Sequence, residues 1–211
     1  MTAPTFAPFG VEDLRHRARR LLRDAPLGAP FVGHDDPRFA ELVRVSELRP
    51  ASVLVGIVDR RPAASVLLIR RADHLAKHSG QIAFPGGKID ASDAGPREAA
   101  LREAREEIGL DPARVEPLGW LDPHATGTGF LIYPMVAIVR PPFELAPDPS
   151  EVAEAFEAPL AFLMDPARHE RESRELRGGI HAYWVMRPDG RKIWGATAAI
   201  VRNLHDRLYA P

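Results

Sequence analysis

The stretch from Gly86 to Leu110 constrains this chain more than any other part of its sequence. It reads GGKIDASDAGPREAALREAREEIGL, a glycine pair, a short acidic loop and then a run of helical composition. Residues three or four positions apart share one side of a helix, so Glu103, Glu106 and Glu107 project from nearly one side within about one turn. Gly109 is a natural left-handed C-terminal cap and predicts the end of the helix there.

Such a gathering of carboxylates destabilises a helix. Like charges spaced i,i+4 cost about 0.2–0.5 kcal/mol a pair, and anions in the last turn oppose the helix dipole by about 0.3–1 kcal/mol each. A hard divalent cation would relieve the total of about 1–2 kcal/mol. Oxygen-only ligands, with no cysteine in the chain and no histidine in the helix, favour Mg²⁺ or Mn²⁺ over zinc.

A solvated face of salt bridges is the second interpretation of the same helix. Glu98 precedes Arg102 by four residues, and Arg102 precedes Glu106 by four. This is the spacing of stabilising ion pairs on a helix surface. The helix alone leaves both interpretations open.

The helix and the loop before it resemble the Nudix hydrolase family. The family's box reads G-x5-E-x7-R-E-U-x-E-E-x-G-U, with U aliphatic, and the residues from Arg102 to Leu110 match its second half throughout. The first half departs from the box: counted from Gly87, Asp93 replaces the early glutamate, and one extra residue precedes Arg102. The resemblance implies an α/β fold, a Nudix-type α/β/α sandwich with a mixed β-sheet.

The segment before the box is similar to the coenzyme A pyrophosphatase branch of that family. The branch carries L-L-x-x-R-[SA]-x-x-L-x-x-H-x-G-Q-x-x-F-P-G-G, and residues 67–87 read LLIRRADHLAKHSGQIAFPGG. Ile69 stands where threonine is usual, and Ala76 stands where arginine is usual. Further family-like pieces at 151–163 and 193–197 extend the resemblance over most of residues 50–205.

This resemblance implies hydrolysis of the diphosphate bond of coenzyme A or its derivatives, giving 3′,5′-ADP and phosphopantetheine, with Mg²⁺ or Mn²⁺ as cofactor. It implies Glu103 and Glu107 as metal ligands. Glu106 is either a further metal residue or the base. Arg102 is expected to hold the loop against the helix, and Gly87 is expected to permit the turn and a close approach to phosphate.

Candidate substrate-binding residues lie inside the pre-box segment. They are Arg70, Arg71, Lys77, His78 and Gln81, of which the cationic ones are candidates for the substrate's phosphates. Beyond the box, Glu151 stands where an additional family carboxylate could enter the site. A charge at the edge of a loop is the other interpretation of Glu151.

Three other functions stay open. A Nudix enzyme for ADP-ribose, a dinucleoside polyphosphate or a damaged nucleoside triphosphate would keep the box. A non-catalytic nucleotide-sensing module commonly loses box carboxylates, and all three are present here. A structural or interaction protein would need no metal.

Composition limits the class of protein. With 211 residues, 45% of them hydrophobic, and no long apolar run, the chain is expected to form one soluble domain and no membrane segment. Residues 1–50 are expected to be an N-terminal helical extension and 51–211 the core with a C-terminal helix. A net charge of −1 gives no electrostatic case for a nucleic-acid partner. Without cysteine or a signal segment, a cytoplasmic location is the default, and self-association is left open.

Apolar periodicity and turn residues predict the remaining elements. Helical segments are expected at 11–24, 38–45, 159–164 and 196–208, besides the one that begins near Pro96. Strands are expected at 51–58, 63–69, 81–84, 115–121, 130–139 and 151–157, with a hairpin formed by 183–186 and 192–194. Loops are expected at 70–79, 122–129 and 141–150, the last as a lid.

Overall fold

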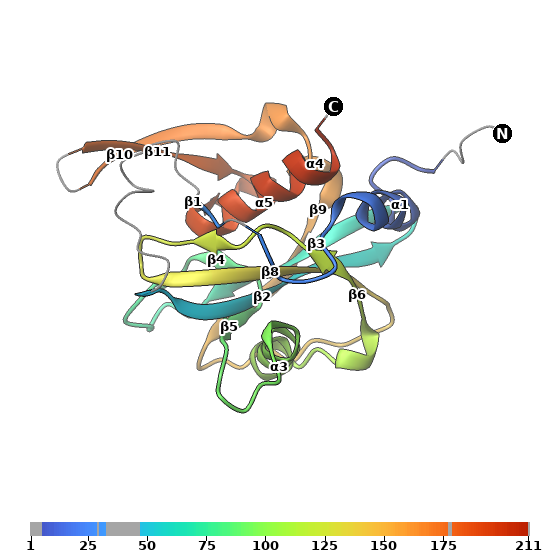
Figure 1. The fold of residues 1–211 in the computed structure, drawn as a ribbon, viewed down its shortest axis with the longest axis horizontal. Coiled ribbons are helices and arrows are strands. Elements are labelled where there is room, and N and C mark those ends of the chain that lie inside the picture. Colours follow the sequence, from blue (N-terminus) through green and yellow to red (C-terminus); the bar gives the residue numbers. More distant parts are fainter. Residues whose placement is uncertain (1–5, 29, 33–46, 177–178, 211) are drawn as a thin grey trace.

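A computed structural model describes residues 6–28, 30–32, 47–176 and 179–210 (Figure 1). The helix expected at 38–45 lies outside these residues. The helices are α1 (Val11–Leu21), α3 (Pro96–Ile108), α4 (Leu160–Leu163) and α5 (Gly195–Leu208), with short 3-10 turns at Pro112–Arg114, Pro166–Arg168 and Pro188–Gly190. The strands of the main sheet are β1 (Phe31–Val32), β2 (Arg49–Arg60), β3 (Ala63–Arg71), β4 (Ile82–Ala83), β5 (Gly86–Lys88), β6 (Val115–Trp120), β7 (His124–Ala125), β8 (Phe130–Val139) and β9 (Val152–Pro159).

The main sheet is mixed. Its strands follow the order β1-β7-β8-β2-β3-β4, while β5, β6 and β9 pair with β2, β8 and β3 respectively. The two long central strands, β2 and β8, run parallel, from the pair Arg49 and Phe130 to the pair Val58 and Val139. β3 and β5 both run antiparallel to β2, so the glycine turn is joined directly to the centre of the sheet.

Helices cover both faces of this sheet. Figure 1 shows α3 on one side and α1, α4 and α5 on the other. Side chains alternate along a strand, so Leu54 of β2 packs in the cluster with Ala104 of α3, whereas Val55 packs in the cluster with Leu204 of α5. Because both faces are buried, the strands read as continuous apolar runs. The predicted α/β/α sandwich with a mixed sheet is confirmed.

A smaller antiparallel sheet of three strands follows the main one. It consists of β10 (Glu170–Leu176), β11 (Gly179–Met186) and β12 (Ile193–Trp194) in that order. The predicted hairpin around residues 187–190 is confirmed by the pairing of Val185 with Trp194. The strand β10 was not predicted, because its sequence ERESREL shows no alternation of apolar residues.

Local signals set both ends of α3. Pro96 begins the helix, and Gly109 ends it with φ 68°, its N–H donating to the Arg105 carbonyl at 2.9 Å. The loop at 141–150 then covers the helix end: the N–H of Ala146 donates to the Ile108 carbonyl at 2.8 Å, and the N–H of Asp148 donates to the Glu107 carbonyl at 2.9 Å. This loop therefore holds the end of the helix in place, and its role as a lid stays a prediction.

Several other boundaries differ from expectation: β2, β3 and β9 extend two residues or more beyond the expected 51–58, 63–69 and 151–157. The first helix ends at Leu21 and not at residue 24, and the loop expected at 122–129 contains the two-residue strand β7. Among the described helices, none is both long and apolar enough to cross a membrane.

Candidate active site

The glycine turn lies directly under the carboxylates of α3. A Cβ atom built on Gly87 would stand 2.6 Å from the carboxyl carbon of Glu103. Gly86 has φ +149°, and a Cβ there would stand 2.3 Å from the carbonyl oxygen of Ser52. Real Cβ atoms do not come this close, so Gly86 is required by the backbone of β2, whereas a side chain at position 87 would displace the Glu103 carboxylate. As a consequence, the Glu103 carboxylate packs directly against the backbone of Gly87.

Glu107 is the most deeply placed carboxylate of the helix. It is 3% exposed, and its Oε2 accepts a hydrogen bond from the N–H of Gly86 at 2.9 Å. Its charged neighbour is Arg71, whose Nη1 lies 3.6 Å from Oε1. The pKa of Glu107 is raised to about 7, chiefly by burial and to a smaller extent by the charges of Glu103 and Glu151, against the opposing effects of Gly86 and Arg71. A negative charge on this carboxylate is therefore disfavoured mainly because the group is removed from water.

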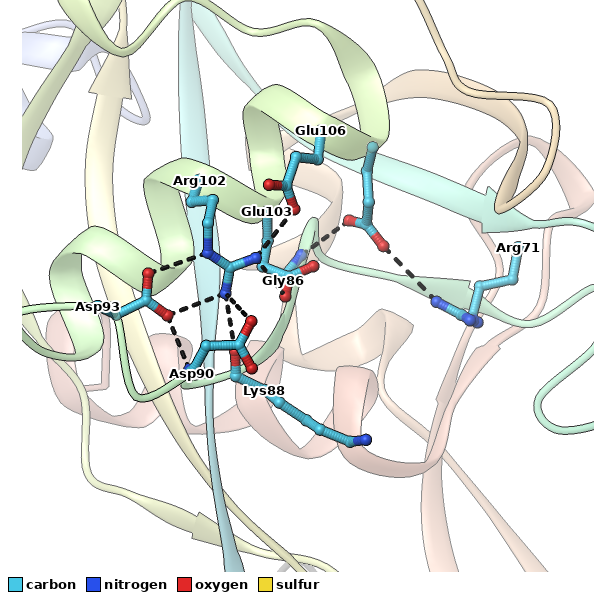
Figure 2. A network of polar contacts seen from close by, with 9 residues as sticks. Arg71, Gly86, Lys88, Asp90, Asp93, Arg102, Glu103 and Glu106 are labelled. Carbon is cyan, nitrogen blue, oxygen red and sulfur yellow. Dashed lines mark hydrogen bonds and ion pairs between the residues drawn. The ribbon is translucent and has the colours of Figure 1, made fainter.

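Arg102 is the centre of a separate network (Figure 2). Its Nε and Nη2 donate to the two carboxylate oxygens of Asp93, both at 2.9 Å, and Nη2 also donates to the Lys88 carbonyl at 3.1 Å. Its Nη1 donates to Glu103 at 3.0 Å and to Glu106 at 2.9 Å. These contacts tie the loop to the helix, the role that the resemblance implies for Arg102.

Asp93 is the residue that departs from the family box. Its side chain is 5% exposed and accepts the bidentate bond of Arg102 and the N–H of Asp90 at 2.8 Å. The Arg102 guanidinium holds the pKa of Asp93 below its usual range. The shorter carboxylate thus reaches the arginine despite the extra residue in the loop.

We expect Asp93→Asn to lower the free energy of unfolding by about 1–2 kcal/mol near pH 7, because a charged bidentate hydrogen bond is replaced by a weaker neutral one. Since the pKa of Asp93 is lowered in the folded state, its stabilising effect is present above the pKa of the unfolded chain. It is lost as the pH falls through the folded value. Urea unfolding at pH 7 and at pH 3 measures the difference.

Asp90→Asn is the matched control, because Asp90 faces the same guanidinium at 3.6 Å with a side chain that is 61% exposed. We expect its effect to be under about 0.5 kcal/mol. Equal destabilisation by the two changes would contradict the role given to Asp93.

The three carboxylates near the end of α3 differ in exposure. The exposed fraction of the side chain is 2% for Glu107, 17% for Glu103 and 60% for Glu106. Burial raises the pKa of Glu103, although Arg102 lowers it. Glu98 does not pair with Arg102 as the salt-bridge interpretation expected; it accepts the N–H of Ala94 at 2.6 Å. The pair of Arg102 and Glu106 does form.

The chemistry of these donors fits a hard divalent cation. They offer only oxygen, and the raised pKa of the buried Glu107 shows that its negative charge is poorly compensated. Within the described ranges, no three histidine, cysteine, aspartate or glutamate side chains are already gathered as a metal site. Glu103 would have to leave Arg102 to join Glu107 around a cation.

The structure brings one of the predicted substrate-binding residues to the carboxylates, and that residue is Arg71. Its neighbour Arg70 points elsewhere and pairs with Asp73 at 2.8 Å, because consecutive residues of a strand face opposite sides. His78 and Gln81 are bonded to each other, Nδ1 to Oε1, at 2.9 Å. Lys77 is exposed in the same loop.

The sequence left the roles of two further groups at the candidate site open or unpredicted. Glu151, for which two interpretations were open, acts electrostatically on both Glu103 and Glu107. Its position is fixed by its carbonyl, which accepts the N–H of Ala72 at 2.8 Å. The sequence did not predict the Lys88 carbonyl as a hydrogen-bond partner of Arg102. The position of Lys88 inside the box loop could have indicated this contact.

Comparison with known proteins identifies the family. The family model of the NUDIX domain matches residues 48–177. Relatives described as the uncharacterized Nudix hydrolase NudL, from Salmonella paratyphi B and Salmonella newport, are 42% identical over 156 residues, which is 74% of this chain and 81% of theirs.

Solved structures with a similar fold include a Nudix hydrolase from M. smegmatis, RenU, at a TM-score of 0.47 and 21% identity, covering 69% of this chain and 82% of that one. A MutT/nudix family protein from Enterococcus faecalis has a TM-score of 0.47 at 16% identity and covers 94% of this chain and 73% of its own. The family match and the NudL relatives show the family, and this chain belongs to the Nudix hydrolases.

Proposed function

We propose that this Nudix hydrolase cleaves the diphosphate bond of coenzyme A or its derivatives to give 3′,5′-ADP and phosphopantetheine, and that it uses Mg²⁺ or Mn²⁺. One observation carries the proposal. The segment at 67–87, which is similar to the coenzyme A branch, delivers Arg71 to 3.6 Å and the Gly86 N–H to 2.9 Å from Glu107. The segment typical of that branch therefore ends at the carboxylates.

The proposed division of labour follows the burial of the carboxylates. Glu103 and Glu107 hold the cation, and Glu106, which is the most exposed of the three, contributes a further ligand or accepts the proton of the attacking water. When bound, the divalent ion withdraws charge from phosphorus and activates water. Arg102 keeps the loop and the helix in register, and Gly87 leaves room for Glu103.

Arg71 has two functions in this proposal. It is the cation nearest to Glu107, and its planar guanidinium suits two oxygens of a diphosphate. Lys77, His78 and Gln81 are proposed to bind the more distant phosphate of the substrate. Arg70 belongs to the same set by sequence, but its pairing with Asp73 makes it the weaker candidate.

We expect Arg71→Ala to lower kcat/KM for coenzyme A by about 10–100-fold, because charge-assisted hydrogen bonds to a phosphate are worth about 1.5–3 kcal/mol. Arg70→Ala is the matched control from the adjacent position. It is expected to change kcat/KM less than about threefold, because Arg70 pairs with Asp73 and points away from the carboxylates. A factor of ten in kcat/KM corresponds to about 1.4 kcal/mol. Steady-state kinetics on the two variants decides between them. Equal losses would contradict the assignment of Arg71.

A second candidate substrate is ADP-ribose or another nucleoside diphosphate derivative. Ala76 favours it, because the coenzyme A branch usually has an arginine there, and a cation for the substrate's extra phosphate is absent at that position. A non-catalytic nucleotide-sensing module is the third candidate, and it requires that none of these compounds is turned over.

Product identification separates the three. The protein is incubated with Mg²⁺ in ¹⁸O-labelled water and with coenzyme A, ADP-ribose or a dinucleoside polyphosphate, and the products are weighed by mass spectrometry. We expect 3′,5′-ADP and phosphopantetheine, one of them carrying the label, at the highest initial rate. A higher rate on ADP-ribose would replace coenzyme A by the second candidate, and no product from any substrate would overturn the enzymatic function.

A further inference from the structure

His74 joins the loop that follows β3 to the segment that precedes β9. Its Nε2 lies 3.0 Å from the carbonyl oxygen of Ser150, although the two residues are 76 positions apart in the sequence. A carbonyl oxygen only accepts hydrogen bonds, so Nε2 carries the hydrogen and donates it. The peptide unit that His74 holds in this way is the one that joins Ser150 to Glu151.

The two peptide units on either side of Glu151 are each held at both of their polar groups. In the first unit, the carbonyl accepts the hydrogen bond of His74, and the Glu151 N–H donates to the Asp148 carbonyl at 3.0 Å. In the second unit, the Glu151 carbonyl accepts the N–H of Ala72 at 2.8 Å, and the following N–H donates to the same Asp148 carbonyl at 2.8 Å. Because peptide units are planar, these four hydrogen bonds fix the direction in which the Glu151 side chain leaves the backbone.

The same segment is tied to the last turn of α3. The N–H of Asp148 donates to the carbonyl of Glu107 at 2.9 Å. Val152, the residue after Glu151, pairs with Arg71, whose Nη1 lies 3.6 Å from the Glu107 carboxylate. The register of β3 and β9 shifts just before this pair, and such irregularities re-aim the side chains beside them. Glu151 therefore stands at the edge of the candidate site.

The charge of Glu151 acts on the carboxylates of α3. Burial is the main cause of the raised pKa of Glu103 and of Glu107, and the charge of Glu151 raises both to a smaller extent. A cation held by Glu103 and Glu107 would therefore also be attracted by Glu151.

We propose that His74 is a positioning residue, which holds the peptide unit before Glu151 so that this carboxylate faces the cation site of Glu103 and Glu107. The proposal rests on the proposed function for the cation that it invokes. Of the four hydrogen bonds around Glu151, the one from His74 comes from a side chain, so substitution can remove it alone.

A purely structural role is the alternative for His74, because a hydrogen bond between two loops stabilises a fold whatever lies beside it. The two roles differ in what they require of Glu151. A structural contact acts independently of the carboxylate, whereas a positioning contact has no further effect once the carboxylate is removed.

A double-mutant cycle on Mn²⁺ binding tests the proposal without a substrate. Electron paramagnetic resonance counts the free Mn²⁺ beside the wild type, His74→Ala, Glu151→Gln and the double variant. We expect each single variant to bind Mn²⁺ about threefold or more weakly, because a negative charge near a divalent ion is displaced or removed. The double variant should bind like Glu151→Gln alone, since His74 then has no carboxylate to position.

A conservative replacement separates positioning from a general loss of contacts. The amide nitrogen of glutamine has about the reach of the histidine Nε2, so His74→Gln can still donate to the Ser150 carbonyl. We expect it to keep Mn²⁺ affinity and kcat for coenzyme A within about twofold of the wild type, whereas His74→Ala lowers kcat about fivefold with little change in KM. His16→Ala is the control and should match the wild type, because His16 is an exposed histidine of α1, on the other side of the sheet from α3 (Figure 1).

Four results would overturn the positioning role: additive losses in the cycle, an unchanged Mn²⁺ affinity in His74→Ala or in Glu151→Gln, or a His74→Gln variant as weak as His74→Ala. The proposed function fails separately. If no substrate were turned over while the Mn²⁺ cycle behaved as expected, the enzymatic function would be wrong and the positioning role would stand. If coenzyme A were cleaved while the cycle gave additive losses, the reverse would hold.

Discussion

Glu107→Gln is expected to lower kcat/KM by about 10³-fold or more while the protein stays folded. The change removes one anionic ligand from the proposed cation site, and the ion contributes several kcal/mol of transition-state stabilisation, each 1.4 kcal/mol being worth a factor of ten. Glutamine keeps the shape of the side chain and can still accept the Gly86 N–H. Because the carboxylate is 3% exposed and its pKa is raised by burial, a neutral group there does not destabilise the protein without metal.

Two measurements separate this effect from misfolding. Thermal unfolding without metal should give the variant a Tm equal to or above that of the wild type, and added Mg²⁺ or Mn²⁺ should raise the Tm of the wild type alone. Glu98→Gln is the matched control on the same helix, since glutamine at this exposed position still accepts the Ala94 N–H. Full activity and an unchanged metal response in Glu107→Gln would refute the site.

The elements that the sequence predicted well are those set by local signals. Pro96 and Gly109 mark both ends of α3, and the structure begins and ends the helix there. The long apolar runs of β2, β3 and β8 reflect burial on both faces, which composition reports directly. β10 was not predicted, because its own sequence lacks the alternation of apolar residues that marks a strand. Its pairing with β11 stabilises it as a strand.

For the candidate site, the sequence predicted the helix carboxylates, the glycine turn and the role of Arg102, but not the partner of each side chain. Helical spacing places Glu103 and Glu107 on one side of α3 for any chain that folds this way. Which carboxylates Arg102 engages depends on the path of a loop with a non-standard length. Arg70 and Arg71 could not be separated, because the expected strand ended at Ile69, and alternation decides between them once β3 is known to extend to Arg71.

Gly86→Ala is expected to destabilise the protein by about 3 kcal/mol or more, the largest effect on stability of any single methyl group near the site. The φ of +149° lies in a region that L side chains rarely adopt, and strain of this kind amounts to about 1–3 kcal/mol. The new Cβ would also stand 2.3 Å from the Ser52 carbonyl oxygen and 2.6 Å from the Val53 Cα. Both are backbone atoms of the central strand β2, so neither can move without displacing the sheet, which adds about 1–3 kcal/mol.

Gly87→Ala, in contrast to Gly86→Ala, is expected to affect activity much more than stability. Its Cβ would meet the carboxylate of Glu103, the far end of a flexible side chain, at 2.6 Å. We expect Glu103 to rotate away, so that stability falls by less than about 1 kcal/mol while kcat/KM falls by about 10²-fold or more through the displaced ligand. Urea unfolding and kinetics on both variants measure this. If Gly87→Ala kept full activity, Glu103 would not act from its place over the glycine turn, and the cation would have to rest on Glu107 and Glu106 instead.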